Sequence, residues 1–312
     1  MSDRATRMAR FLAATPWRDW RVEPIATDAS ARSYARLRGP SGSVIVMDAD
    51  PEVVTDTAAF LTIARWLTAQ GFVAPRLLAQ DAEAGFLVLS DLGETRLSDA
   101  LEARPDAADA LFDAATDVLV RLDAAAPPPG LAALTPAVAG QMVAITAELY
   151  ARTDPTDLVA ATEAAYADLV PDRVALRDMH VENLVWREDE PPQDRIGLLD
   201  FQDALLAPRG YDLASMLSDV RRDVPECQRD RQIARFAEAT GTPAETVRRD
   251  TAILGAQRNL RILGVFTRLV AGGKLRYAAL MPRVRATLAR DLAHPALRDL
   301  ARVVARTLPE AA

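Results

Sequence analysis

Two short stretches in the second half of the chain carry residues suited to phosphoryl transfer. In the first, Asp178 is followed five residues later by Asn183, in a predicted loop after a strand-like run at 173–176. In the second, Asp200 closes another strand-like run at 196–199, seventeen residues beyond Asn183. Phosphoryl transfer from ATP needs one carboxylate near the acceptor hydroxyl, and oxygen ligands that hold Mg²⁺ against the phosphates. One carboxylate followed by an amide and a second carboxylate meets this need.

The composition argues against several other chemistries. The chain has 312 residues and a net charge of −7, which disfavours general binding to nucleic acid. A single cysteine, Cys227, excludes disulfides within the chain and cysteine-based zinc sites. The two histidines, His180 and His294, do not have metalloprotease spacing. Lys274 is the one lysine of the whole chain, so pyridoxal and aldolase chemistry are disfavoured.

Neither a signal peptide nor a membrane-spanning segment is indicated by the sequence. Arginines interrupt the short apolar stretches near the N-terminus, and no run approaches the roughly 18 to 20 apolar residues of a membrane span. We therefore expect a cytoplasmic protein without membrane or nucleic-acid partners, and the sequence indicates no obligate protein partner.

The elements that must position the candidate residues fall into two predicted lobes. The first ninety residues alternate short extended runs with one main helix, and the expected strands are 22–26, 33–38, 43–49, 76–80 and 86–89. After residue 92, alanine-rich helical segments dominate, and everything from Tyr211 onward is predicted to be helical. The sequence thus predicts an α+β chain with a β-rich lobe at 1–91 and a larger helical lobe at 92–312.

This order of elements, together with the D-x-x-x-x-N loop and the later aspartate, resembles the kinase-like phosphotransferases of the aminoglycoside phosphotransferase and choline kinase type. The resemblance implies a protein-kinase-like two-lobe fold with an antiparallel N-terminal lobe. It also implies that ATP and Mg²⁺ are the cofactors. In that family pattern Asp178 is the catalytic base, and Asn183 and Asp200 are the Mg²⁺ ligands.

The loop departs from the family pattern H-G-D-x-H-x-x-N at two positions. His180 matches the second histidine, but Leu176 and Arg177 stand where the family has His and Gly. That first histidine is normally structural, so activity is not excluded. Downstream, Asp212 falls in the first turn of a predicted helix, where a carboxylate suits the helix N-terminus. In the resembling family an aspartate here holds the catalytic loop in place.

The nucleotide-binding side of the first lobe is less orthodox. It has no G-x-G-x-x-G motif, and the third predicted strand, 44–49, lacks the lysine that kinases usually carry. The turn between the first two strands offers Ser30 and Arg32 as phosphate donors, with Arg32 as the candidate to replace the lysine; an ordinary polar turn is the favoured alternative on spacing alone. Backbone groups from Ser90 to Leu92 are expected to contact the purine.

Four stretches of the chain resemble one branch of this family, the anomeric kinases of N-acetylmuramate and N-acetylglucosamine in bacterial cell-wall recycling. They are residues 28–34, 46–51, 199–213 and 257–266. That branch also has Met-Asp-Ala where the strand lysine would be. The resemblance implies ATP-dependent phosphorylation of the C1 hydroxyl of one or both sugars.

A predicted helix in the C-terminal lobe offers cations for an acidic acceptor. Arg261 shares one helical face with Gln257, Gly264 and Arg268, and Arg258 is adjacent. The carboxylate of N-acetylmuramate favours an arginine partner. Arg258 and Arg261 are therefore candidate sugar ligands, whereas a solvated helix face is the favoured interpretation for Arg268.

Gln202 and Asp203, just past the second aspartate, are two further candidate sugar ligands. Two alternatives remain open on the sequence. One keeps the fold and changes the acceptor to an aminoglycoside, choline or homoserine. The other is a non-catalytic kinase-like protein that binds nucleotide, which the missing lysine favours and the complete Asp-Asn-Asp set disfavours.

Overall fold

The computed structural model describes residues 3–26, 31–55 and 57–309. The chain packs as two compact units: a sheet unit of residues 1–100 and 182–203, and a helical unit of residues 101–181 and 204–312. The lobe boundary between residues 91 and 92 stays a prediction. Over the described ranges, no helix is both long enough and apolar enough to cross a bilayer.

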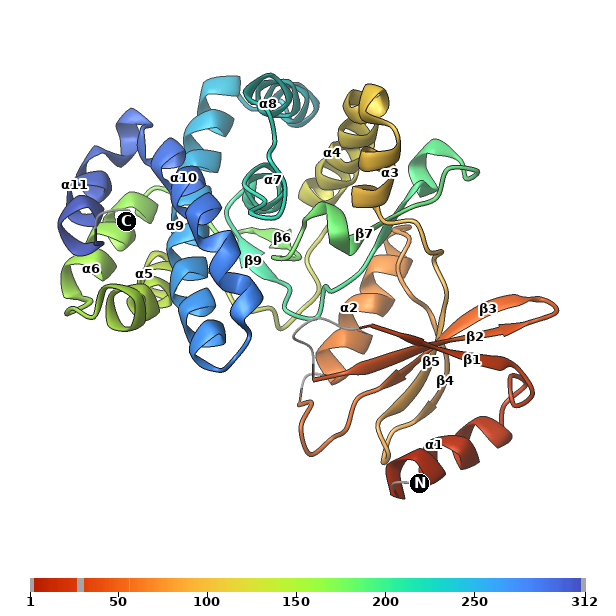
Figure 1. Cartoon of the computed structure of the whole chain (residues 1–312). Coiled ribbons are helices and arrows are strands. Elements are labelled where there is room, and N and C mark those ends of the chain that lie inside the picture. Colours follow the sequence, from red (N-terminus) through yellow and green to blue (C-terminus); the bar gives the residue numbers. More distant parts are fainter. Residues whose placement is uncertain (1–2, 27–30, 56, 310–312) are drawn as a thin grey trace. The chain divides into compact units, whose positions relative to one another are not determined.

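The sheet unit is built on one antiparallel sheet of five strands, with the order β1-β2-β3-β5-β4 (Figure 1). Its elements are α1 (Asp3–Ala13), β1 (Arg21–Ile25), β2 (Ser33–Gly39), β3 (Gly42–Asp48), α2 (Thr57–Ala69), β4 (Leu77–Asp81) and β5 (Phe86–Ser90). Gly39 pairs with Gly42 at the end of the β2–β3 hairpin, and Gly42 has a φ of 124°, which a side chain would disfavour. The β-rich first part of the predicted fold is therefore confirmed.

Helix α1 covers one face of this sheet. Its apolar side chains pack on a small core, and the residues of α1 and of the strands in this contact are Met8, Phe11, Leu12, Leu37, Val44, Val46 and Val88. Arg4 of α1 also pairs with Asp48 at the end of β3. Since strand side chains alternate between faces, the fully buried Met47 points to the opposite side of β3.

A second hairpin belongs to the sheet unit, although it comes from the middle of the chain. It consists of β7 (Leu184–Trp186) and β8 (Ile196–Leu198), with the 3₁₀ turns η3 (Val181–Asn183) and η4 (Pro192–Asp194) beside it. The Leu198 amide donates to the Val73 carbonyl at 2.8 Å. Just beyond β8, the ring of Phe201 stacks on Phe60 of α2, with centroids 5.1 Å apart. These contacts fix the end of the hairpin against α2.

The helical unit surrounds one long central helix, α9. Its elements are η1 (Pro105–Ala107), α4 (Ala108–Ala124), α5 (Pro136–Ile145), the π-helical turn η2 (Thr146–Ala151), α6 (Thr156–Tyr166), β6 (Arg173–Ala175), β9 (Leu205–Ala207), α7 (Tyr211–Leu217), α8 (Glu226–Thr240), α9 (Ala244–Ala271), η5 (Leu275–Leu280), α10 (Met281–Leu292), η6 (Pro295–Leu297) and α11 (Arg298–Thr307). Helix α3 (Leu97–Ala103) spans the division between the units. In Figure 1, α5 and α6 lie on one side of α9, and α7 and α8 lie on the other. The predicted helical second part is confirmed.

A threonine hydroxyl contacts two backbone groups of α9. Thr146 Oγ1 donates to the carbonyl of Leu260 and accepts from the amide of Gly264 at 3.2 Å. These two groups are four residues apart, the spacing of a hydrogen bond within an α-helix. A Cβ at Gly264 would lie 2.7 Å from Ile145, so glycine permits this close approach. The contact fixes α9 directly after Arg261, one of the predicted sugar ligands.

Candidate active site

Asp178 lies in the loop that follows β6, and a buried carboxylate holds this loop in place. The amides of Leu176 and Arg177 donate to the two oxygens of Asp212, at 2.7 and 2.9 Å. The Ser215 hydroxyl donates to the Arg177 carbonyl at 3.1 Å. Both Asp212 and Ser215 are on α7, a helix whose seven residues are all buried. The predicted role of Asp212 in holding the loop is thus confirmed.

The two departures from the family loop pattern have different structural consequences. Leu176 is 2% exposed and belongs to the hydrophobic core. Arg177 has a φ of 75°, in the left-handed region that glycine adopts without strain. A glycine would therefore fit the backbone at this position better than the arginine that is present.

The hairpin of β7 and β8 brings Asn183 and Asp200 together. Asn183 directly precedes β7, and Asp200 follows β8 by two residues. The backbone pairing of the two strands continues beyond their ends, because the Leu199 amide donates to the Asn183 carbonyl at 3.0 Å. As a result Asn183 Nδ2 lies 3.4 Å from Asp200 Oδ2. Asp200 is exposed and has a φ of 58°, which aspartate tolerates better than most residues.

This pair fits a hard divalent cation. A half-turn of the Asn183 amide exchanges Nδ2 for Oδ1, so that both side chains present oxygen to the same point. Mg²⁺ is commonly held by one or two protein oxygens, with water and substrate phosphates completing its shell. Within the described ranges, no cluster of three His, Cys, Asp or Glu side chains offers an alternative metal site.

Cationic side chains gather around Asp178 within the helical unit. Arg258 Nη2 lies 3.6 Å from Asp178 Oδ1, and the Arg258 side chain is only 8% exposed. Arg261 follows one turn later on α9, and burial together with the charge of Arg177 lowers its pKa. Burial and the charges of Arg221 and Arg258 lower the pKa of His180 well below its usual value, so this histidine is neutral at pH 7.

The sequence of the chain decides the family. The profile described as "Phosphotransferase enzyme family" matches residues 21–249. The chain belongs to this phosphotransferase family. It is 33% identical to the N-acetylmuramate/N-acetylglucosamine kinase of Caulobacter vibrioides, over 96% of this chain and 95% of that protein. It is 34% identical to the kinase of the same description from Pseudomonas aeruginosa, over 93% of this chain and 89% of that protein.

Solved structures agree with the fold of this phosphotransferase. Wild-type aminoglycoside 2'-phosphotransferase-IIIa, solved with GDP, matches with a TM-score of 0.66 and 13% identity, over 94% of this chain and 99% of that one. Choline kinase LicA from Streptococcus pneumoniae matches with a TM-score of 0.60 and 17% identity, over 86% and 93%. The predicted protein-kinase-like fold is confirmed. At these identities the likeness concerns the fold alone.

The phosphotransferase's predicted nucleotide residues have unequal structural support. Ser30 lies outside the described residues. Arg32, directly before β2, is 7% exposed. The Ser90 amide donates to the Arg76 carbonyl and the Ser90 hydroxyl accepts from the Arg76 amide, at 2.9 Å each, so the Ser90 amide is already paired. Leu92 is partly exposed. These four assignments stay predictions.

Sequence reasoning missed an ion pair beside this segment. Arg36 of β2 donates to Asp91 at 2.5 and 3.1 Å, and the Ser43 hydroxyl donates to the same carboxylate at 2.7 Å. Burial opposes the ionisation of Asp91, but these bonds outweigh it and its pKa lies below the usual value. Asp91 thus ties β2 and β3 to the chain that leaves β5. The only sign of this ion pair in the sequence was that Asp91 stands two residues before Gly93.

The predicted sugar ligands of the phosphotransferase belong to both units. Arg258 and Arg261 are in the helical unit, whereas Gln202 and Asp203 are in the sheet unit. Gln202 Nε2 donates to Asp200 Oδ1 at 2.8 Å, so it also orients the candidate metal ligand. Asp203 is exposed. All four assignments stay predictions.

The helix face that includes Arg261 is mostly a packing surface. Gln257 is fully buried and donates to the Ala139 carbonyl at 3.2 Å. Gly264 packs against Ile145, and Arg268 alone of this face is exposed. Arg268 thus has the solvated position that was predicted for it.

Replacing Asp212 by Asn should lower kcat and change the pH dependence of stability. Asn offers one acceptor oxygen to the two loop amides, so the loop shifts and we expect kcat to fall about ten- to a hundredfold. Burial raises the pKa of Asp212 from 3.8 to about 6. Its stabilising contribution is therefore full below about pH 3.8 and is lost as pH rises through 6.

The stability measurement for this variant is denaturant unfolding between pH 7 and pH 4. The stability advantage of the wild type over Asp212→Asn should grow by up to about 3 kcal/mol as pH falls across this range. Asp168→Asn, at an exposed site of the same unit, is the matched control and should change neither property. An advantage that stays constant with pH would contradict the raised pKa.

Proposed function

We propose that this phosphotransferase transfers the γ-phosphoryl group of ATP to the C1 hydroxyl of N-acetylmuramate, N-acetylglucosamine or both, in cell-wall recycling. The observation that carries this proposal is the 33% identity with the Caulobacter kinase of these sugars over 96% of this chain. ATP is the usual cytoplasmic phosphoryl donor, so the proposal places the protein in the cytoplasm.

Asp178 acts as the base in this proposal. Its side chain is 44% exposed, so an acceptor can reach it, and the loop amides on Asp212 fix its backbone. As the acceptor oxygen forms its bond to phosphorus and the bond to the leaving ADP breaks, the hydroxyl proton moves to the Asp178 carboxylate. Arg258, 3.6 Å from that carboxylate, orients it.

Asn183 and Asp200 would hold Mg²⁺. An ion held there would supply positive charge to neutralise the phosphates. The hairpin sets the separation of the two ligands, and Gln202 orients Asp200 through its bond to Oδ1. Arg32 and the segment from Ser90 to Leu92 are the proposed nucleotide contacts, with Ser30.

The charge around Asp178 supports an anionic or neutral acceptor over a cationic one. Arg258 pairs with Asp178 at 3.6 Å, and Arg261 lies one turn further along α9. Aminoglycosides and choline carry positive charge, which these guanidinium groups repel. The kinase descriptions of the relatives also disfavour a protein that only binds nucleotide.

The test is ADP release from Mg²⁺-ATP with four acceptors in turn: N-acetylmuramate, N-acetylglucosamine, kanamycin and choline. We expect turnover with one or both N-acetyl sugars, and phosphorus NMR should identify the product as a sugar 1-phosphate. Turnover with kanamycin or choline alone would overturn the proposed acceptor. Phosphorylation of a sugar at another hydroxyl would overturn the proposed position.

A further inference from the structure

The hairpin that carries Asn183 and Asp200 is too short to fix their positions alone. Its two strands pair over three residues each, and an isolated hairpin is at most marginally stable in water. The candidate metal ligands lie at its open end, where Asn183 and Leu199 pair beyond the strands. The separation of the two ligands therefore depends on the chain segments that flank the hairpin on each side.

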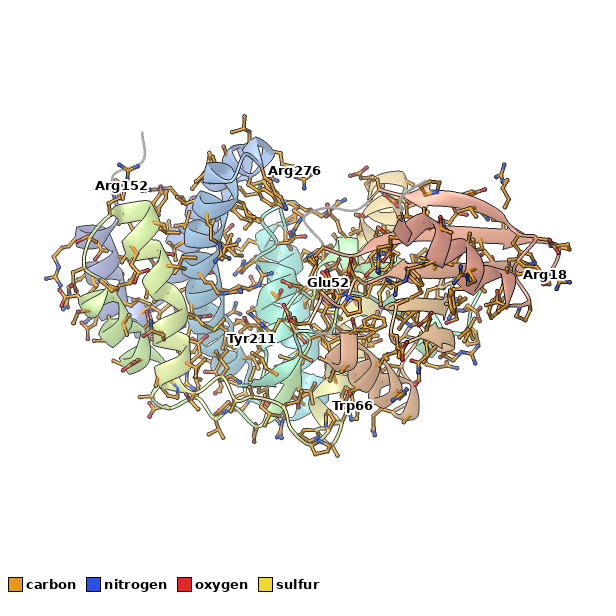
Figure 2. The ribbon with its side chains drawn as sticks, turned by 90° about the horizontal axis from the view of Figure 1, so that it is seen from below. Arg18, Glu52, Trp66, Arg152, Tyr211 and Arg276 are labelled. Atoms are coloured by element: carbon orange, nitrogen blue, oxygen red, sulfur yellow. The ribbon has the colours of Figure 1, made fainter. Side chains whose placement is uncertain are left out.

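One flank of the hairpin is anchored to α2. The Leu198 amide of β8 donates to the Val73 carbonyl at 2.8 Å. Val73 follows Phe72, whose ring centroid lies 6.3 Å from that of Trp66, a side chain of α2 that is labelled in Figure 2. Aromatic packing on a helix therefore fixes the outer edge of β8.

The other flank is formed by residues 91–96, which join β5 to α3 and which we call the β5–α3 segment. The Trp186 amide of β7 donates to the Thr95 carbonyl at 2.8 Å. Leu92 packs on β8, because a Cβ added at Gly197 would lie 3.0 Å from the Cδ1 atom of Leu92. The backbone of this segment is irregular, so side chains from elsewhere must hold it against the hairpin.

An ion pair with β2 holds the β5–α3 segment. Arg36 of β2 donates to both oxygens of Asp91, and its Nη2 also donates to the Gly93 carbonyl at 3.2 Å. The Asp91 carboxylate accepts two more bonds, from the Ser43 hydroxyl at 2.7 Å and the Gly93 amide at 3.0 Å. The Arg36 and Asp91 side chains are only 12% and 5% exposed. A bidentate pair of this kind is strong and directional. We call Arg36, Ser43 and Asp91 the clamp.

We propose that the clamp positions the metal ligands of the reaction, because it holds the β5–α3 segment against the hairpin that carries Asn183 and Asp200. This inference rests on the proposed function, which assigns Mg²⁺ to these two ligands. The contacts are continuous, since the clamp fixes the start of the segment, Leu92 and Thr95 contact the hairpin, and Asn183 directly precedes β7. Loosening the clamp would displace the ligands and leave their side chains intact.

The test is the affinity for ADP, measured by isothermal titration calorimetry on the full-length protein in Mg²⁺ and in EDTA. The factor by which Mg²⁺ strengthens ADP binding separates the metal ligands from the contacts to the base. Arg36→Met removes every donor of the arginine, and this factor should fall about tenfold, as when other residues that hold metal ligands in place are replaced. Arg36→Lys, which keeps the charge, should recover part of the loss.

Ser43→Ala is a milder second variant. It removes one bond to Asp91 and leaves the arginine pair, so the protein should fold with a melting temperature close to that of the wild type. The Mg²⁺ factor should fall about threefold, in keeping with the loss of one hydrogen bond to the clamp. The direction of the change should therefore be the same as in Arg36→Met.

Arg231→Met is the matched control. Arg231 of α8 donates to both oxygens of Asp113, at 3.0 and 2.6 Å, so this is the same chemical change in the helical unit. It should leave the Mg²⁺ factor unchanged. If Arg36→Met and Ser43→Ala lost ADP affinity equally with and without Mg²⁺, the clamp would support only the nucleotide contacts and this inference would be overturned.

Unchanged ADP affinity in both conditions would also overturn this inference, and in either case the proposed function would stand. A wild type that phosphorylates neither sugar would instead sink the proposed function, and this inference with it.

Discussion

Asp178→Asn should lower kcat by about 10²- to 10⁴-fold, the usual contribution of a general base. The asparagine keeps the size of the side chain and can still orient an acceptor hydroxyl, but it cannot accept the proton. Asp212 and Ser215 hold the loop backbone, and an asparagine oxygen can still face Arg258. We therefore expect the variant to fold with a melting temperature close to that of the wild type. The measurement is ADP release at saturating ATP and sugar.

Asp172→Asn is the matched control for this substitution. Asp172 lies just before β6, its side chain is 52% exposed, and it contacts Arg173 at 3.5 Å. The same chemical change there should leave kcat within about a factor of two, since surface pairs of this kind contribute little. If Asp178→Asn retained more than a tenth of the wild-type kcat, Asp178 would not be the base.

The family resemblance, rather than the strand pattern, predicted that Asn183 and Asp200 lie close together. The strand before Asp200 was predicted, but the strand β7 that follows Asn183 and completes the hairpin was not. The bracing of the catalytic loop by Asp212 was also predictable, because the resemblance included both stretches. Local pattern and family resemblance therefore recovered the contacts that lie within one motif.

Contacts that depend on packing between distant segments could not be predicted. The arginine at position 177 does not itself indicate a left-handed backbone, since most residues with that φ are glycines; only the glycine of the family pattern at this position does. The contact of the Thr146 hydroxyl with the α9 backbone joins residues 114 apart. The pair of Arg36 and Asp91 joins residues 55 apart. The periodicity of apolar residues predicts which face of a helix or strand is buried, but it does not predict which polar groups of distant segments meet there.

Asp200→Asn should lower kcat/KM for Mg²⁺-ATP by about 10³-fold. The variant holds the metal less firmly, so the reacting phosphates lose several kcal/mol of charge stabilisation. Asparagine is suited to this test, since it tolerates the left-handed φ of 58° that Asp200 adopts. The stacking of Phe201 on Phe60 does not involve the carboxylate, so the fold at the end of β8 should be retained. The loss of one negative ligand should also raise the Mg²⁺ concentration that gives half-maximal rate.

The dependence on Mg²⁺ separates a metal ligand from a residue that merely supports the loop. A supporting role would lower kcat at every Mg²⁺ concentration and leave the half-maximal concentration unchanged. Asp194→Asn, at the 3₁₀ turn between β7 and β8, is the matched control, because its backbone carbonyl rather than its carboxylate accepts from Arg187. It should behave as the wild type in both measurements. A half-maximal Mg²⁺ concentration equal in Asp200→Asn and the wild type would assign Asp200 to the support of Asn183 and remove it from the metal site.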